Sequence, residues 1–240
     1  MKSLKLPAAD RGQLENDEFE GAAIFSNGQY GTKRPAQFGS LYVFNDDRLF
    51  PDSYLGMHPH ANVEIVTIMI YGEESHKDSL GIHENYTGGD VQLISAGTGL
   101  RHAGGNPSST EDARHLQIWI VPRSFNTPPG VTILVSSNKP SIGKYEKLMV
   151  SPDGTSGSLK INQDLWISEL RLSRAEFYDS SDRNADHGFM LYVVEGKAAL
   201  GEQILDRGDT LFFTETTHFE ISSLADNTFL VLLETRLDAG

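Results

Sequence analysis

The chain has 240 residues, of which 38% are hydrophobic, and carries a formal net charge of −13. This length allows one large domain or two of about 120 residues, and the acidic balance, without a cluster of Lys and Arg, argues against direct binding of nucleic acid. Cysteine is absent, so disulfides, thiolate nucleophiles and cysteine-ligated zinc or iron–sulfur sites are excluded, and any metal must be held by histidine, carboxylate or water.

The N-terminal segment lacks the sustained apolar stretch that a secretion signal needs. No apolar run approaches the roughly 18 residues that would span a bilayer. We therefore expect a soluble, cytoplasmic protein without a membrane segment.

Four strand-like runs separated by turns follow Gly39 in the first half of the chain. They cover residues 40–44, 63–71, 91–94 and 116–121. The run from Ile65 to Ile70 is apolar at nearly every position, which is typical of a strand covered on both faces. Helix signals are few, and the 23 glycines suit a protein with many turns.

A Pro- and Ser-rich stretch, residues 124–144, separates these runs from a second set. The second set covers residues 166–172, 189–194, 197–200, 210–213 and 229–234. An apolar strand, a glycine turn and a Gly-Asp turn recur in both sets, with Gly72 matching Gly196. We therefore predict an all-β chain of two tandem domains, 1–130 and 131–240, with few short helices.

The segment from Met57 to Glu64 contains the first candidate metal ligands. Residues two apart in an extended chain point the same way and lie about 6.6 Å apart, so His58 and His60 can converge on one ion. Pro59 restricts His58 to extended conformations and has no N–H to leave unpaired. Glu64 shares the parity of the pair, and we expect its carboxylate in the same barrel interior.

A third histidine, His102, follows a glycine-rich turn that can bring the next strand back across this site. A His-x-His pair alone is often two ordinary surface histidines, and His102 is what favours a metal site. Three imidazoles with a carboxylate suit iron, copper, nickel, manganese or zinc, and the sequence does not choose among these metals.

The other histidines of the first half, His76, His83 and His115, fit no comparable geometry, and His76 is expected to pack in a turn. In the second copy of the repeat, Asp182 and Asn184 stand where the histidine pair stood. The second domain is therefore expected to lack metal ligands.

An ordered series of motifs in the first half resembles the signature of the pirin family. The resemblance covers nearly the whole chain and is strongest from Gly39 to Val121, while the segment 151–164 looks like the second domain of bacterial members. The motifs are His58-Pro59-His60 with Glu64, Gly72 with His76-Lys77-Asp78-Ser79 and Gly81, Gly89-Asp90-Val91-Gln92, Ala96-Gly97-Thr98-Gly99 with His102, Asn106-Pro107-Ser108, and Leu116-Gln117-Ile118-Trp119-Ile120.

The resemblance implies a bicupin fold, two tandem antiparallel β-barrels, with Fe(II) or a similar ion in the N-terminal barrel and none in the other. It also implies an activity of the quercetin 2,3-dioxygenase type, in which O2 opens the heterocycle of a flavonol and carbon monoxide is released. The expected partners are a small planar phenolic substrate and O2. Animal members are also described as nuclear transcriptional cofactors.

The chain departs from the family at the fourth metal ligand. Pirins usually add a glutamate two residues beyond the third histidine, and this position is Gly104 here. Three outcomes are open: Glu64 takes the place of that ligand, water fills it, or the site binds metal weakly or not at all. Retained binding is favoured because three imidazoles still form a usable set, and Glu64 is then the expected catalytic base.

Two functions from different classes remain. The first is a metal-dependent dioxygenase acting on quercetin or a similar planar phenol. The second is a catalytically silent bicupin that senses metal or redox state, or binds a protein partner. A third, a cupin isomerase or decarboxylase, rests only on the versatility of the fold.

Overall fold

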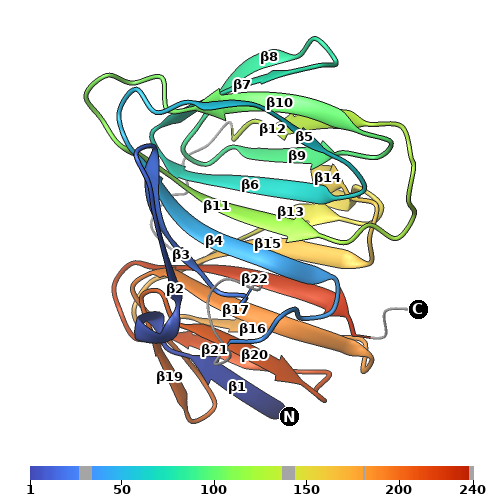
Figure 1. The fold of residues 1–240 in the computed structure, drawn as a ribbon. Coiled ribbons are helices and arrows are strands. Elements are labelled where there is room, and N and C mark those ends of the chain that lie inside the picture. Colours follow the sequence, from blue (N-terminus) through green and yellow to red (C-terminus); the bar gives the residue numbers. More distant parts are fainter. Residues whose placement is uncertain (27–33, 137–143, 181, 238–240) are drawn as a thin grey trace. The chain divides into compact units, whose positions relative to one another are not determined.

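Strands make up nearly all the regular structure of the chain (Figure 1). The computed structural model describes residues 1–26, 34–136, 144–180 and 182–237. The helices of these residues are two single 3-10 turns, η1 (Ala8–Asp10) and η2 (Thr155–Gly157), and none of them is long and apolar enough to cross a membrane. The prediction of an all-β chain with few short helices is confirmed.

Contacts divide the chain into two units, which we call the N-terminal and the C-terminal barrel. The N-terminal barrel comprises Gly12–Ser137 with Ile161–Gln163, and the C-terminal barrel comprises the rest of the chain. The first eleven residues belong to the C-terminal barrel because the first strand pairs along β20. The predicted bounds, 1–130 and 131–240, differ from this division because residues 1–11 belong to the C-terminal barrel and residues 161–163 to the N-terminal barrel. The domain limits remain a prediction.

Two antiparallel sheets build the N-terminal barrel. One has the strand order β12-β9-β6-β11-β4-β3-β2, and the other has the order β5-β10-β7-β8. The strands are β2 (Gly12–Glu15), β3 (Phe19–Ala23), β4 (Leu41–Leu49), β5 (Leu55–His60), β6 (Glu64–Tyr71), β7 (Glu73–Asp78), β8 (His83–Thr87), β9 (Val91–Ser95), β10 (Leu100–Gly105), β11 (Ala113–Ile120) and β12 (Gly130–Leu134).

The C-terminal barrel repeats this plan. Its larger sheet has the order β1-β20-β17-β22-β15-β13-β14 and its smaller sheet β16-β21-β18-β19. The strands are β1 (Lys2–Leu6), β13 (Tyr145–Ser151), β14 (Leu159–Lys160), β15 (Leu165–Leu172), β16 (Phe177–Asp179), β17 (His187–Glu195), β18 (Lys197–Leu200), β19 (Gln203–Asp206), β20 (Thr210–Thr214), β21 (Glu220–Ser223) and β22 (Thr228–Arg236).

The core of the C-terminal barrel is a continuous apolar cluster. Phe189 and Phe213 stack with ring centroids 5.1 Å apart, and Phe219 packs against both. Leu191 and Leu232 belong to the same buried cluster. Each such side chain stabilises the fold by about 1.5–3 kcal/mol through removal from water.

Strands with apolar sequences were predicted, and polar strands were missed. The run from Ile65 to Ile70 lies in β6, whose first six residues are buried. Strands β7 and β8 carry the sequences EESHKD and HENYT, which lack the apolar alternation that marks a strand. His76 therefore lies in a strand, and the expectation that it packs in a turn is wrong.

Gly72 and Gly196 end the matched strands of the repeat in the same conformation, with φ of +79° and +84°. In each barrel the backbone also passes close to the beginning of a neighbouring strand, β11 or β22. A Cβ at Gly196 would lie 2.5 Å from the carbonyl oxygen of Asn227, and one at Gly72 would lie 2.6 Å from Cα of Ala113. Glycine is required at both positions for conformation and for space.

Replacing Gly196 by alanine should lower the free energy of unfolding by about 1–3 kcal/mol, because the new methyl group forces a shift of backbone. The change would be measured as a lower thermal midpoint. Gly201→Ala is the matched control, since Gly201 also has a positive φ, +57°, but a Cβ there meets nothing within 4 Å. An equal or greater loss in the control would contradict the steric argument.

Candidate metal centre

Two neighbouring antiparallel strands bring three histidines together. His58 and His60 lie on β5, and His102 on β10 is the direct cross-strand partner of His58. Pro59 separates the pair and faces Arg101 in the ladder, as expected for alternating sides of a strand. The ring centroids are 4.4 to 5.0 Å apart, and one ligand nitrogen from each ring lies within 4.8 Å of the others. These atoms can reach a single ion.

The protonation states of these rings suit metal binding. Burial, and then repulsion by His58, lowers the pKa of His60 to about 4. Burial and the neighbouring histidines lower the pKa of His102 to about 3. Both rings are therefore neutral at neutral pH, which is the form that coordinates metals. The Nδ1 of His58 lies 2.8 Å from the carbonyl oxygen of Gly56, so donation there leaves Nε2 as the ligand atom.

The structure does not bring Glu64 to these histidines, which corrects the expectation from strand parity. Its carboxylate accepts hydrogen bonds from the Ser95 hydroxyl at 2.7 Å and from the backbone N–H of Asn162 at 3.4 Å. Between His60 and Glu64 the chain turns at Asn62, where φ is +53°, so parity does not carry from β5 to β6. The cavity-lining face of β6 instead presents Ile65.

Gly104 leaves no room for a side chain in this backbone. It lies opposite Leu55 across a bulge on one side and opposite His76 on the other. A Cβ at this position would lie 2.3 Å from the carbonyl oxygen of Ser75. At the position where the resemblance implies a glutamate ligand, the backbone therefore leaves no space for a side chain.

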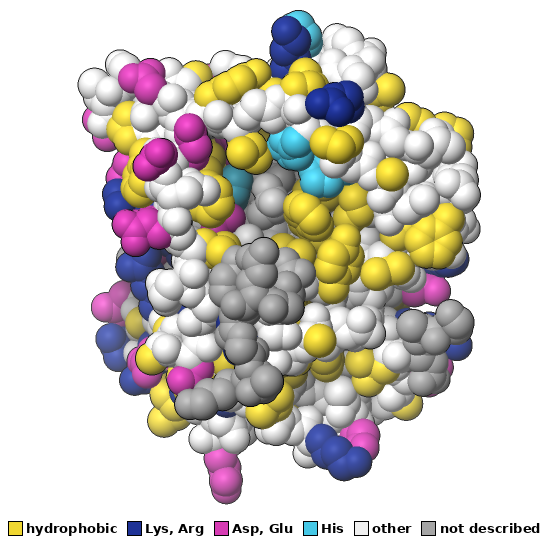
Figure 2. Space-filling model, in the orientation of Figure 1, with side chains coloured by type: hydrophobic (Ala, Val, Ile, Leu, Met, Phe, Trp, Pro, Cys, Tyr) yellow, Lys and Arg dark blue, Asp and Glu magenta, His cyan; other side chains and the backbone are white. Residues whose placement is uncertain are grey.

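The three histidines border a cavity of about 270 Å³ inside the N-terminal barrel. Figure 2 shows histidine and hydrophobic side chains around a hollow on this face. Trp119 and Ile65 contribute to an apolar wall, and the Trp119 ring packs edge-on against His60 at 5.0 Å. Among the described residues that line the cavity there is no Lys or Arg. The site can hold a small, largely apolar molecule beside the histidines.

A buried His–Asp pair lies next to the three histidines. The His76 ring is centred 5.5 Å from that of His102, and its Nε2 lies 2.9 Å from a carboxylate oxygen of Asp78. The other Asp78 oxygen accepts backbone N–H groups from Leu80 and Ile82. With Nε2–H donated to Asp78, the Nδ1 of His76 remains an acceptor in the cavity wall.

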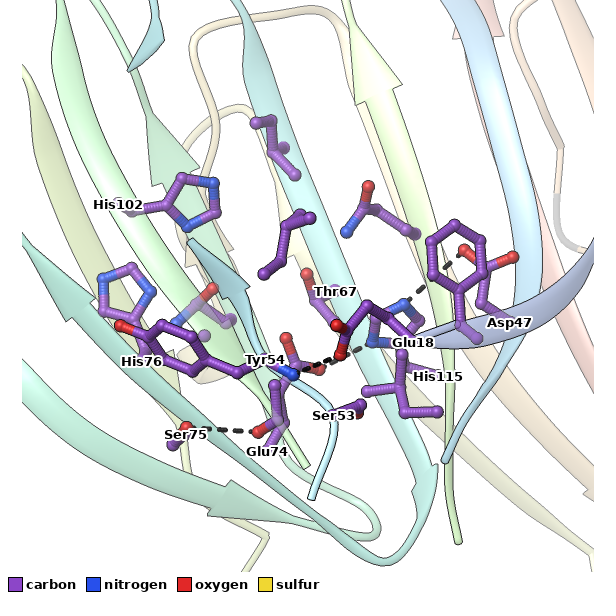
Figure 3. Close-up of a pocket in the computed structure, with 18 of the residues that line it drawn as sticks. Glu18, Asp47, Ser53, Tyr54, Thr67, Glu74, Ser75, His76, His102 and His115 are labelled. Carbon is purple, nitrogen blue, oxygen red and sulfur yellow. Dashed lines mark hydrogen bonds and ion pairs between the residues drawn. The ribbon is translucent and has the colours of Figure 1, made fainter. Parts of the chain in front are cut away.

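A second histidine that the sequence did not single out lies deeper in the cavity. His115 Nδ1 is 2.6 Å from a Glu74 oxygen, and its Nε2 is 3.7 Å from an Asp47 oxygen. Burial alone would lower the pKa of His115, but the two carboxylates outweigh burial and raise the pKa to about 10. Figure 3 shows His115 and Asp47 on one side of the cavity and His76 and His102 on the other.

Each barrel matches a protein-family model. The family model described as Pirin matches residues 9–120. The model described as Quercetinase C-terminal cupin domain matches residues 148–233. Family similarity therefore extends over the greater part of each barrel.

Individual proteins of similar sequence and structure support the same family assignment. A protein named Quercetin 2,3-dioxygenase from Escherichia coli (strain K12) is 30% identical over 224 residues, covering 93% of this chain and 95% of that protein. A Pirin-like protein from Caulobacter vibrioides is 39% identical over 172 residues, 72% of each chain. The crystal structure of the bacterial pirin YhhW from Escherichia coli in complex with nickel(II) is 28% identical, with a TM-score of 0.90 over 98% of this chain and 99% of that one. These matches confirm the bicupin fold.

Replacing Gly104 by glutamate should destabilise the protein without completing a ligand set, because its Cβ cannot pass the Ser75 carbonyl. We expect a loss of about 1–3 kcal/mol in the free energy of unfolding. Nickel affinity, measured by calorimetry, should not exceed that of the unmodified chain. Gly104→Ala should show the same loss of stability, and tighter nickel binding by a stable Gly104→Glu protein would contradict the steric account.

His115 should stabilise the fold in a pH-dependent way. Its pKa is higher in the folded protein, about 10, than in an unfolded chain, about 6.5, so its contribution is full below pH 6.5 and is lost as the pH rises through 10. The difference in free energy of unfolding between the unmodified chain and His115→Gln should shrink from pH 6 to pH 10. Denaturant titrations test this, with the exposed His83→Gln as control, and a pH-independent difference would contradict it.

Proposed function

The chain belongs to the pirin family, and we propose that it is a metal-dependent dioxygenase of the quercetin 2,3-dioxygenase type. The observation that carries the proposal is the convergence of three imidazoles at the wall of a cavity inside the N-terminal barrel. In the described part of the chain, no second group of histidines and carboxylates has this spacing. A single metal centre in the N-terminal barrel follows.

His58, His60 and His102 would hold the ion. Nitrogen ligands of this type suit Fe(II), our first choice, and also nickel, copper, manganese and zinc. The relative YhhW was crystallised with nickel(II), which makes nickel a practical probe. Bound there, the metal would lower the pKa of a substrate hydroxyl. Water would complete the ligand set in place of the glutamate.

The cavity favours a neutral planar phenol as substrate. Its apolar wall, with Trp119 and Ile65, suits a flat aromatic ring. Besides the histidines and Tyr54, its ionisable groups are the carboxylates of Glu18, Asp47 and Glu74, and no described lining residue is Lys or Arg. An anionic substrate such as a dicarboxylate would meet like charge there. This argues against the decarboxylase alternative.

His76 replaces Glu64 as the residue that would receive the substrate hydroxyl. Asp78 holds the His76 ring through Nε2, so Nδ1 can accept a hydrogen bond from a hydroxyl placed beside the metal ligands. In the overall reaction both atoms of O2 enter the opened flavonol and one carbon leaves as carbon monoxide. Trp119 and Ile65 would keep the reacting ring away from bulk water.

Aerobic incubation with quercetin tests the proposal. The protein loaded with iron or nickel should consume the flavonol, followed by loss of its absorbance, with release of carbon monoxide. His58→Ala should reduce the rate by at least about 100-fold, since even outer partners of metal sites are worth about 10- to 100-fold. His83→Ala, an exposed histidine outside the cavity, is the control. A metal-loaded protein no faster than His58→Ala would favour the silent sensing or partner-binding bicupin.

A further inference from the structure

Four neighbouring strands place a polar side chain at the same register level inside the N-terminal barrel. Thr67 on β6 pairs with Gln92 on β9 and with Gln117 on β11, and Gln117 pairs with Asn45 on β4. All four residues line the cavity that the metal-site histidines border. We call Gln92, Thr67, Gln117 and Asn45 the polar row.

The polar row lies one level along the strands from the apolar wall. Trp119 is two residues from Gln117 on β11, and Ile65 is two residues from Thr67 on β6, so the levels are about 7 Å apart. Trp119 packs against His60, so the apolar wall borders the metal-site histidines, and the polar row is the next level along the strands. A molecule of two linked rings, bound at the histidines, would reach the row.

The row has hydrogen-bonding capacity that the described protein does not use. Gln92 is only 2% exposed, yet its amide nitrogen has no partner. The side-chain oxygen of Gln117 accepts the Trp119 indole N–H at 3.1 Å, which leaves its amide N–H groups free. Leaving a buried polar group unpaired opposes folding, so such a group marks a place where a partner is expected.

The C-terminal barrel shows that the fold does not need polarity at this level. Its corresponding strands, β20, β17, β22 and β15, place Leu211, Leu191, Leu232 and Ser168 in the same register relation. The three leucines belong to the buried apolar cluster. The C-terminal barrel therefore fills most of this level with leucine, while the N-terminal barrel keeps three primary amides and one hydroxyl facing a cavity.

The row is neutral, which limits the chemistry of its ligand. The charged groups one level deeper are already engaged with one another, because His115 lies between Glu74 and Asp47. Amide and hydroxyl groups donate to and accept from uncharged oxygens, such as phenolic hydroxyls and ketone carbonyls. An anion would be repelled by the carboxylates around the row.

We propose that the polar row is a specificity site that binds hydroxyl groups on the part of the substrate remote from the metal. This deepens the proposed function and rests on it for the orientation of the substrate. It assigns the substrate class as neutral, planar phenols that carry hydroxyl groups at both ends, in preference to flavonols without remote hydroxyls.

Anaerobic binding to the nickel-loaded protein tests this directly, with quercetin and 3-hydroxyflavone as probes. Both molecules carry the same hydroxyl–ketone pair for the metal, and only quercetin carries remote hydroxyls. Trp166→Phe removes the other tryptophan of the chain, so quenching of Trp119 fluorescence reports binding in the cavity. Gln92→Met removes the unpartnered amide while conserving size, and Thr67 is left unchanged because its hydroxyl is hydrogen-bonded to Tyr86.

Gln92→Met should weaken quercetin binding by about 3- to 10-fold, as expected for a neutral hydrogen bond, and change 3-hydroxyflavone binding by less than about 2-fold. Ser168→Val in the C-terminal barrel should change neither, and thermal unfolding checks that all variants fold. Equal effects on both ligands, no effect on quercetin, or no binding of quercetin to the unmodified chain would overturn the proposal. Since no O2 is present, a protein that fails to turn over quercetin can still show this discrimination, so the two proposals fail separately.

Discussion

The placement of β10 between β5 and β7 is the constraint on which the candidate site depends. On one side this strand sets His102 against His58, and on the other it sets His102 against Asp78. A slip of one residue would turn His102 to the opposite face of the sheet. The same close pairing holds Gly104 against the Ser75 carbonyl, so the register that assembles three imidazoles also excludes a side chain at the fourth-ligand position.

The two barrels share a topology and differ in what fills them. In the C-terminal barrel the inner level defined by Leu191 and Leu232 is closed by apolar packing, which removes the space a ligand would need. In the N-terminal barrel the corresponding level is polar and borders a cavity. Burying polar groups without partners opposes folding. The N-terminal barrel therefore gives up apolar packing at the level where we propose a binding role, and the C-terminal barrel does not.

Local patterns in the sequence predicted what depends on local geometry, and little more. Alternation across Pro59 was enough to pair His58 with His60 because all three residues lie in one strand. Parity failed for Glu64 because the positive φ of Asn62 begins a new strand in another sheet. His115 could not be assigned in advance, since its partner Glu74 lies 41 positions away and only the barrel closes that distance.

Histidines in opposite protonation states within one cavity restrict where a metal can bind. His60 and His102 are kept neutral by burial and by other imidazoles, whereas carboxylates hold a proton on His115 up to a pKa of about 10. An imidazolium whose two nitrogens both carry hydrogens has no lone pair for a metal. Displacing that proton would also leave Glu74 and Asp47 without their shared counter-charge. The buried His115 thus belongs to the protein's electrostatic support, and the group of three histidines is the place where a metal would bind.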